Sequence, residues 1–303
     1  MNIHHYNSLN NYLKNTFGRK LYKLSLNAGF TCPNRDGTID TRGCIFCSRG
    51  GSGDFASSHL LSITEQIEEG RKRVINKLPA SSRSNSLPSY IAYFQAFTNT
   101  YADIDTLRCV YTEAINHPDI AAISIATRPD CLDDNIISLL DELNKIKPVW
   151  VELGLQTIHA KTAEYIRRGY DLSVYDNAVR KLCNINIPQI ITHVILGLPG
   201  ESKDMMLETV KYVVASGSNG IKLQLLHVLR NTDLETDYNN GSFKTLTLED
   251  YIELLCNCID IIPDNIIVHR LTGDGPKNLL IAPSWSADKK MVLNTISKYI
   301  KPL

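Results

Sequence analysis

Residues 149–155 read Val-Trp-Val-Glu-Leu-Gly-Leu, an almost continuous apolar run with the length of a β-strand. Similar runs stand at 22–27, 90–95, 121–126, 190–196 and 220–226. Amphipathic segments of helical length separate them, at 63–77, 104–116, 135–146, 174–184 and 203–216. Largely apolar strands that alternate with helices predict a parallel sheet covered on both faces. We therefore expect an α/β fold, either a partial (β/α)6 barrel of the TIM type or a doubly wound sheet.

The sequence outside this alternation predicts an N-terminal segment (1–20) before the barrel (21–230) and a C-terminal extension (231–303). The extension is expected to hold a loop through Lys244, a helix at 248–262, a strand at 266–271 and a last helix from about Asp288. The serine-rich stretch 80–89 reads as a surface loop. Thr64–Glu65 and Ser202 offer capping groups at helix starts.

Composition and charge restrict the classes of protein to which this chain can belong. The chain has 303 residues, with 32 Lys plus Arg and 32 Asp plus Glu, so its formal net charge is zero. Any contact with nucleic acid must therefore come from local basic patches. No stretch reaches the ~20 apolar residues of a membrane span, and no export signal is recognised. These features predict a cytoplasmic protein without a membrane partner.

Eight cysteines are present, and three of them stand apart from the rest. We expect the other five to be buried thiols that act as small hydrophobic residues; they are Cys109, Cys131, Cys183, Cys256 and Cys258. Cys32, Cys44 and Cys47 follow the first strand in a glycine-rich loop with the spacing C-x11-C-x2-C. Three thiolates from one loop can bind a soft metal centre.

The identity of that centre has two readings. A structural zinc ion would need a fourth ligand, for which His59, His4 or His5 is available. A 4Fe-4S cluster held by three cysteines would leave one iron open to another ligand. The position after a strand, on the face where parallel α/β folds carry their sites, favours the catalytic reading.

These residues resemble the radical S-adenosylmethionine (SAM) superfamily. Three cysteines after the first strand, with Phe46 before the last, are typical of it. The segments 27–38 (NAGFTCPNRDGT), 95–102 (QAFTNTYA) and 270–274 (RLTGD) closely resemble the YhcC/YtqA-like radical SAM proteins. The resemblance implies a 4Fe-4S cluster on Cys32, Cys44 and Cys47, a SAM cofactor and a partial barrel.

The middle of the chain also resembles the radical SAM domain of the Elongator catalytic subunit. The matching segments are 127–130 (TRPD), 152–156 (ELGLQ), 167–170 (RRGY) and 197–201 (GLPGE). This resemblance implies that Gln156 and Arg168 hold SAM, with Arg168 pairing with the methionyl carboxylate.

Other parts of the site depart from the superfamily pattern. Thr98 and Asn99 stand where relatives often carry a glutamate that meets the methionyl amino group, and they are the expected acceptors here. Strand alternation directs Glu152 and Gln224 into the barrel, where they are candidates for SAM or substrate contacts. His193 is expected to be a hydrogen-bonded histidine of the barrel interior.

The resemblance implies that the cluster cleaves SAM to a 5′-deoxyadenosyl radical, which removes a hydrogen atom from a substrate. An external flavodoxin or ferredoxin-like protein would donate the electron. The Elongator-like core implies side-chain modification of a tRNA wobble uridine. The available basic residues are Arg71, Lys72, Arg73, Lys77, Arg83, Lys289, Lys290, Lys298 and Lys301. Two alternatives stay open: a radical SAM enzyme for a small metabolite, and a non-enzymatic zinc protein.

Overall fold

The computed structural model describes residues 3–51, 53, 56–75, 89–273 and 275–303. Most of the expected serine-rich loop, together with Lys77 and Arg83, lies outside these residues.

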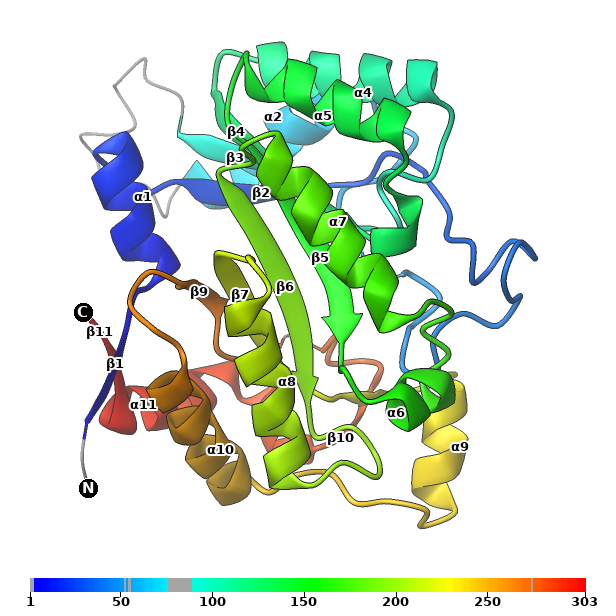
Figure 1. Ribbon diagram of the computed structural model, residues 1–303, viewed down its shortest axis with the longest axis vertical. Coiled ribbons are helices and arrows are strands. Elements are labelled where there is room, and N and C mark those ends of the chain that lie inside the picture. Colours follow the sequence, from blue (N-terminus) through cyan, green and yellow to red (C-terminus); the bar gives the residue numbers. More distant parts are fainter. Residues whose placement is uncertain (1–2, 52, 54–55, 76–88, 274) are drawn as a thin grey trace.

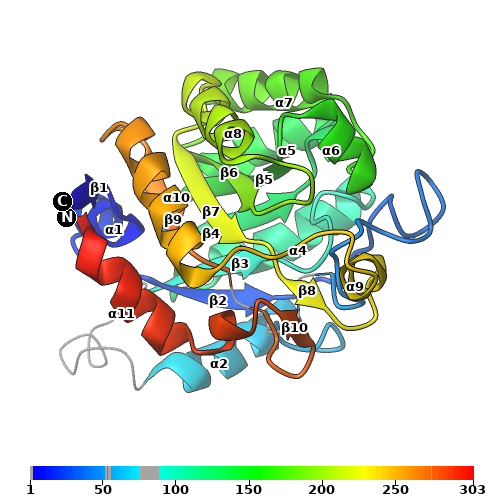
Figure 2. The ribbon, with the colours of Figure 1, turned by 90° about the horizontal axis from the view of Figure 1, so that it is seen from below.

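One curved parallel sheet of seven strands forms the centre of the described chain, in the order β2-β3-β4-β5-β6-β7-β9. Its strands are β2 (Tyr22–Leu26), β3 (Tyr90–Phe94), β4 (Ile120–Thr127), β5 (Val149–Gln156), β6 (Gln189–Leu196), β7 (Gly220–Leu225) and β9 (Ile267–Arg270). Figure 2 shows the sheet curving around an interior, with helices on its outer side. The expected partial barrel is confirmed, and the strand of the extension adds a seventh member to the six expected.

Helices between consecutive strands cover the outer face, as the crossover connections of a parallel sheet require. They include α2 (Ile63–Val74), α4 (Ile104–Asn116), α5 (Asp134–Asn144), α7 (Leu172–Asn184), α8 (Lys203–Ala215) and α10 (Leu248–Ile261). Ser202 caps α8, as expected. Ser62 rather than Thr64 is the N-cap of α2, because its side chain accepts from Glu65 N while the Glu65 carboxylate accepts from Ser62 N.

The amino-terminal end of the barrel is closed by an apolar layer. Helix α1 (Leu9–Phe17) brings Leu13 against a cluster of buried side chains from the sheet. That cluster contains Leu21, Ile91, Ala122, Trp150 and Ile191. Two residues further along five of the strands, the inward side chains become polar, because alternate residues of a strand share a face. The interior is therefore closed at the amino-terminal ends of the strands and open at their carboxyl ends.

The terminal parts of the chain meet at one side of the barrel. Strand β1 (His4–Tyr6) pairs in parallel with β11 (Ile300–Pro302), which follows α11 (Lys289–Tyr299). Figure 1 shows both termini there. The division at residues 20 and 230 stays a prediction, because none of these contacts tests whether the parts fold independently.

Several short elements complete the described chain. They are η2 (Pro129–Cys131), α6 (Ala160–Tyr165), β8 (Val228–Leu229), α9 (Asp233–Asn239), β10 (Leu280–Ala282) and η3 (Ser284–Ala287). The expectation of a loop through Lys244 is wrong in part, because α9 interrupts it. Thr232 caps this helix, and its apolar residue Leu234 is buried against Ile45 of the cysteine loop.

The expectation of five buried structural thiols is also wrong in part. Cys258 is buried, Cys131 and Cys256 are half-buried, and Cys109 and Cys183 are exposed. The exposed pair lies on the outer helices α4 and α7, where the sequence around a cysteine is apolar on one face only. In the described part of the chain, none of the helices combines the length and the apolar character needed to cross a bilayer.

Candidate functional site

A cavity of about 540 Å³ occupies the barrel interior and reaches the loops beyond the carboxyl ends of the strands. Eight of the nine residues predicted for the site line it: Cys32, Cys44, Cys47, Thr98, Glu152, Gln156, Arg168 and Gln224. The ninth, Asn99, is buried behind the wall, where its side-chain nitrogen donates to Ala126 O at 2.9 Å. The strands and the cysteine loop thus bring together residues that are up to 192 positions apart in sequence.

The cysteine loop is held in place by hydrogen bonds to its own backbone and to the chain after β5. Cys47 N donates to Cys44 O at 3.0 Å, which forms a turn between the two thiols. Arg35 donates to the backbone oxygens of Cys47 and Ser48 at 2.9 and 2.7 Å. Asn34 Nδ2 donates to Arg167 O at 2.6 Å and lies 3.5 Å from Cys44 Sγ. These hydrogen bonds fix the conformation of the loop that carries the three cysteines.

Close packing of the glycine at position 51 also fixes this loop. Gly51 has φ +60° and its oxygen accepts from Phe97 N at 2.9 Å. A Cβ atom at Gly51 would come within 2.3 Å of the Phe97 ring. A glycine is needed here because both the backbone conformation and the space exclude a side chain.

The surroundings of Cys44 contain groups that oppose and groups that favour its ionisation. Burial and the neighbouring Cys47 thiol raise the pKa of Cys44 to about 11, and Arg128 opposes this shift. A metal ligand must lose the thiol proton, so the raised pKa is a cost to metal binding. Arg128 and the Asn34 amide reduce that cost, because they supply positive charge and a hydrogen bond to the thiolate.

The donor set bears on the choice between the two predicted metal centres. A structural zinc ion is almost always held by four protein ligands. Three cysteines line the cavity, and three soft thiolates suit an iron–sulfur cluster with one iron open to another ligand.

Two amide side chains at the upper wall keep unused acceptors. Gln156 ends β5 with φ +67°, and its Oε1 atom is buried without a hydrogen-bond partner in the described structure. Asn99 Oδ1 is likewise buried and unpartnered among these residues. Buried polar atoms are nearly always hydrogen-bonded, so an unpartnered acceptor beside a cavity is a candidate for contact with a ligand that carries donor groups. Gln156 is such a candidate, because the residue lines the cavity.

Arg168 has a structural role in addition to the SAM contact that the resemblance implies. Its guanidinium donates to the backbone oxygens of Leu155, Thr157 and Tyr170. These bonds use four of its five N–H groups. The Tyr170 ring lies between two guanidinium groups, 4.6 Å from that of Arg168 and 5.3 Å from that of Arg128. The pairing of Arg168 with a carboxylate stays a prediction, with one N–H group available for it.

A layer of polar side chains forms the bottom of the cavity, directly above the apolar layer. Its members, named here the charged layer, are Lys23, Tyr93, Ser124, Glu152, His193 and Lys222. The fully buried Glu152 is its centre: Lys23 donates to Oε1 at 2.6 Å, Ser124 donates to Oε1 at 2.8 Å, and Lys222 donates to Oε2. His193 Nε2 lies 2.8 Å from Oε2, so the expectation of a hydrogen-bonded interior histidine is confirmed.

Burial and the interactions between its charged groups shift the pKa values in this layer. Although burial opposes it, the two lysines hold the pKa of Glu152 well below its usual range. Burial lowers the pKa of Lys222 to about 7, against the pull of Glu152. Burial and Lys222 lower the pKa of His193 to about 4, so this imidazole is neutral at pH 7.

Sequence reasoning missed Lys23 and Lys222 of this layer. A signal was present, because each lysine stands at an inward position of a largely apolar strand, in Tyr-Lys-Leu-Ser-Leu and Gly-Ile-Lys-Leu-Gln-Leu. A charged side chain at such a position is almost never fully buried unless it is paired. The partner, Glu152, had been identified as an inward residue from strand alternation.

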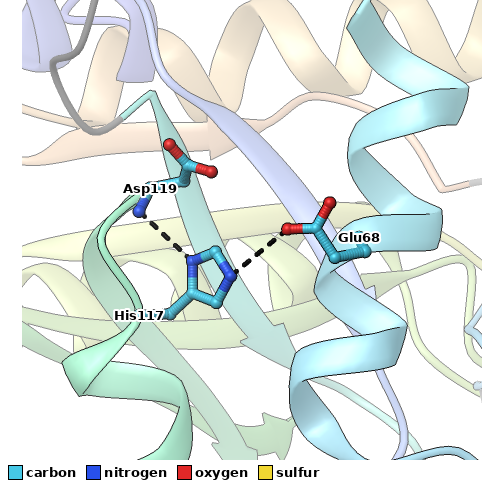
Figure 3. A group of neighbouring side chains, drawn as sticks. All are labelled: Glu68, His117 and Asp119. Atoms are coloured by element: carbon cyan, nitrogen blue, oxygen red, sulfur yellow. Dashed lines mark hydrogen bonds and ion pairs between the residues drawn. The ribbon is translucent and has the colours of Figure 1, made fainter.

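A second cluster of metal-ligating side chains lies outside the barrel. Figure 3 shows His117 between Glu68 on α2 and Asp119, with Nε2 3.4 Å from Glu68 Oε1 and Nδ1 accepting from Asp119 N at 3.2 Å. Arg71 pairs with Glu68 at 2.7 Å and with Asp119 at 2.9 Å. Because Arg71 already pairs with both carboxylates, this cluster is an ion-pair network that joins α2 to the start of β4.

Comparison with known proteins agrees with this geometry. The chain matches the family model of the radical SAM superfamily over residues 41–213 and that of the Radical_SAM C-terminal domain over 218–302. It is 44% identical to YtqA of Bacillus subtilis over 98% of this chain and 89% of that protein. It is 35% identical to YhcC of Escherichia coli over 95% of this chain and 90% of that protein.

More distant similarity extends to an acetyltransferase and to a protein with a solved structure. A tRNA uridine(34) acetyltransferase of Methanocaldococcus jannaschii is 24% identical over 53% of this chain and 29% of that protein. The structure of Elp3 from Methanocaldococcus infernus superposes with a TM-score of 0.67 at 16% identity, covering 92% of this chain and 63% of that one. The fold, the three-cysteine cavity and these matches lead to one assignment: the chain belongs to the radical SAM superfamily, with YtqA and YhcC among its relatives.

Proposed function

We propose that this protein is a radical SAM enzyme that modifies the side chain of a tRNA wobble uridine. The observation that carries the first part is the convergence of Cys32, Cys44 and Cys47 with Gln156 on one cavity. The three thiols would hold a 4Fe-4S cluster, and Gln156 and Thr98 would bind SAM. When bound, the cluster and SAM supply a 5′-deoxyadenosyl radical, which abstracts an unactivated hydrogen atom.

The chain's own residues would bind and shield the reactants. The apolar layer around Trp150 closes the bottom of the barrel, and Phe46 and Ile166 border the cavity above it. Exclusion of water prevents side reactions of a reactive intermediate. Arg128, fixed by Asp130 at 2.7 Å, supplies positive charge beside the thiolates. An external one-electron donor, a flavodoxin or a ferredoxin-like protein, would complete the system.

The tRNA part of the proposal is supported by the partial match to the uridine(34) acetyltransferase. That match covers about half of the chain, as does the Elongator resemblance. The basic residues of α2 give little support, since Arg71 and Arg73 are paired with acidic residues of the protein itself. Lys289, Lys290 and Lys298 on α11 are exposed and offer a surface for phosphate contacts.

The experiment uses purified protein with its cluster rebuilt under anaerobic conditions. Dithionite, SAM and bulk tRNA from a strain that lacks the gene are added, and the nucleosides are separated and weighed by mass spectrometry. The proposal predicts a mass change in one wobble uridine, absent in a Cys44→Ala control. Unchanged nucleosides together with SAM cleavage would reject tRNA as the substrate and favour a small metabolite.

A further inference from the structure

Cationic side chains outnumber carboxylates among the described residues that line the cavity. Among the described residues that line it, six are lysine or arginine, and Glu152 is the one carboxylate. The six cations are Lys23, Arg35, Arg128, Arg168, Lys222 and Arg270. Such an excess of one charge in a partly closed space attracts a ligand of the opposite charge.

The cations near the cysteine loop have partners of their own. Arg35 and Arg168 donate to backbone oxygens, and Arg128 pairs with Asp130, which lies outside the cavity. The cations of the upper part of the cavity therefore have partners within the protein.

The charged layer at the bottom lacks this balance. Lys23 and Lys222 share the single carboxylate of Glu152, so two positive charges face one negative charge when both amines are protonated. The two nearby imidazoles add no negative charge, since His193 and His269 are neutral or positive. Arg270 is the cross-strand neighbour of Lys222 in the pairing of β7 with β9. Its positive charge is a further contribution to the lowered pKa of Lys222.

Two cations with one shared carboxylate in a buried layer cost stability. Taking an ammonium group out of water without a full counter-charge costs several kcal/mol. A hydrophobic residue at position 222 would leave a one-to-one pair of Lys23 with Glu152 and would avoid that cost. A second buried cation is retained in binding sites because the ligand supplies the missing charge.

We propose that the charged layer binds an anionic group of the substrate, a carboxylate or a phosphate, through Lys222 and Lys23, with Glu152 holding both lysines in position. This inference rests on the proposed function for its statement that the ligand is the substrate. It defines the substrate class as a molecule or nucleotide side chain with a negative charge that reaches the bottom of the barrel. The closed apolar layer below means that this group enters from the cysteine side.

The test is a binding experiment that does not depend on SAM cleavage. Protein with its cluster rebuilt is unfolded by heat under anaerobic conditions and followed by circular dichroism. Inorganic phosphate is titrated in one series and acetate in another, each against sodium chloride at constant ionic strength. A ligand that binds the folded state raises Tm in a saturable way. The series with the tighter binding identifies the class of anion.

The variants separate this site from general salt effects. Lys222→Met is expected to weaken anion binding at least about tenfold, because a charge-assisted hydrogen bond is lost. Lys222→Arg keeps the charge in a bulkier side chain and is expected to bind the anion more tightly than Lys222→Met. Lys211→Met removes an exposed lysine of α8 and is expected to leave binding unchanged. Without an anion, Lys222→Met is expected to have a Tm at or above that of the wild type, which shows that it folds.

Two results would overturn the proposal. One is the absence of a saturable rise in Tm in the wild type, or an equal rise in Lys222→Met. The other is loss of the rise in Tm when SAM is present, because the charged layer would then bind the carboxylate of the cofactor. Neither result concerns the cysteine site, so failure here and failure of SAM cleavage are distinguishable.

Discussion

The side-chain nitrogen of Asn34 lies 3.5 Å from Cys44 Sγ and donates to Arg167 O at 2.6 Å. One buried amide thus links the cysteine loop, the turn that follows α6, and a sulfur atom of the predicted cluster. Hydrogen bonds to ligand sulfurs are among the factors that set the reduction potential of an iron–sulfur cluster. Asn34 is therefore the residue through which the fold is expected to tune this site.

Replacing Asn34 tests that relationship. Asn34→Asp keeps the shape of the side chain but removes the N–H donor and adds a negative charge. The cluster is expected to be harder to reduce, with a more negative potential, because the reduced form carries more negative charge near this position. A redox titration followed by electron paramagnetic resonance measures the shift. An unchanged potential in a variant with full iron content would refute the role of Asn34.

The identity of the metal ligands is tested by a matched set of cysteine variants. Serine at Cys32, Cys44 or Cys47 is expected to reduce iron and acid-labile sulfide to background after reconstitution, because a three-ligand cluster has no spare thiolate. Cys131→Ser is the control: Cys131 is half-buried and electrostatically coupled to Cys32, but it is not in the predicted ligand set. Loss of iron from Cys131→Ser would show that the ligand set is wrong.

Gln156 is expected to contact SAM through its unpartnered Oε1 atom. Gln156→Ala should weaken SAM binding about fivefold, the effect of one neutral hydrogen bond of ~1 kcal/mol. Equilibrium dialysis with labelled SAM measures this change. Equal affinity in the wild type and in Gln156→Ala would mean that the acceptor faces something else.

A second variant at the same position separates binding from backbone strain. Gln156→Gly loses the same acceptor, but glycine tolerates the φ of +67° that costs other residues ~1–2 kcal/mol. It should bind SAM as weakly as Gln156→Ala while unfolding at a higher urea concentration. If the alanine variant is the more stable of the two, the left-handed conformation is not a source of strain.

Stability should depend on pH through Lys222. The pKa of Lys222 in the folded state is about 7, below its ordinary value of 10.5 in the unfolded chain. Between these values the unfolded state binds more protons, so the contribution of Lys222 to the free energy of unfolding rises with pH. The slope is at most ~1.4 kcal/mol per pH unit.

Urea unfolding of the wild type and Lys222→Met between pH 7 and 9 tests this dependence, because other titrating groups are common to both proteins. The difference in unfolding free energy should grow in favour of the wild type as pH rises. The exposed Lys211→Met should give a constant difference. Parallel curves for the wild type and Lys222→Met would contradict the buried, paired state of Lys222.

The sequence predicted the barrel well, because strands and helices leave local patterns. The apolar run 149–155 matches β5 (Val149–Gln156) to within one residue. The three cysteines stand within one loop, and their role as metal ligands stays a prediction. The charged layer was not predictable as a unit, since its members come from β2 to β7 and meet only through the stagger of the strands. Short elements such as α9 were missed because seven residues carry too little periodicity. The hydrogen bonds from Arg168 to backbone oxygens could likewise not be predicted from the sequence.

The central claim is that Cys32, Cys44 and Cys47 hold a cluster that acts on SAM in this cavity. The most direct test is anaerobic: the cluster is rebuilt, dithionite and SAM are added with hypomodified bulk tRNA, and 5′-deoxyadenosine is measured by liquid chromatography. The account predicts formation of 5′-deoxyadenosine by the wild type and background amounts from Cys44→Ala. A wild-type protein that holds a 4Fe-4S cluster, binds SAM and still forms no 5′-deoxyadenosine with tRNA or cell extract would contradict it.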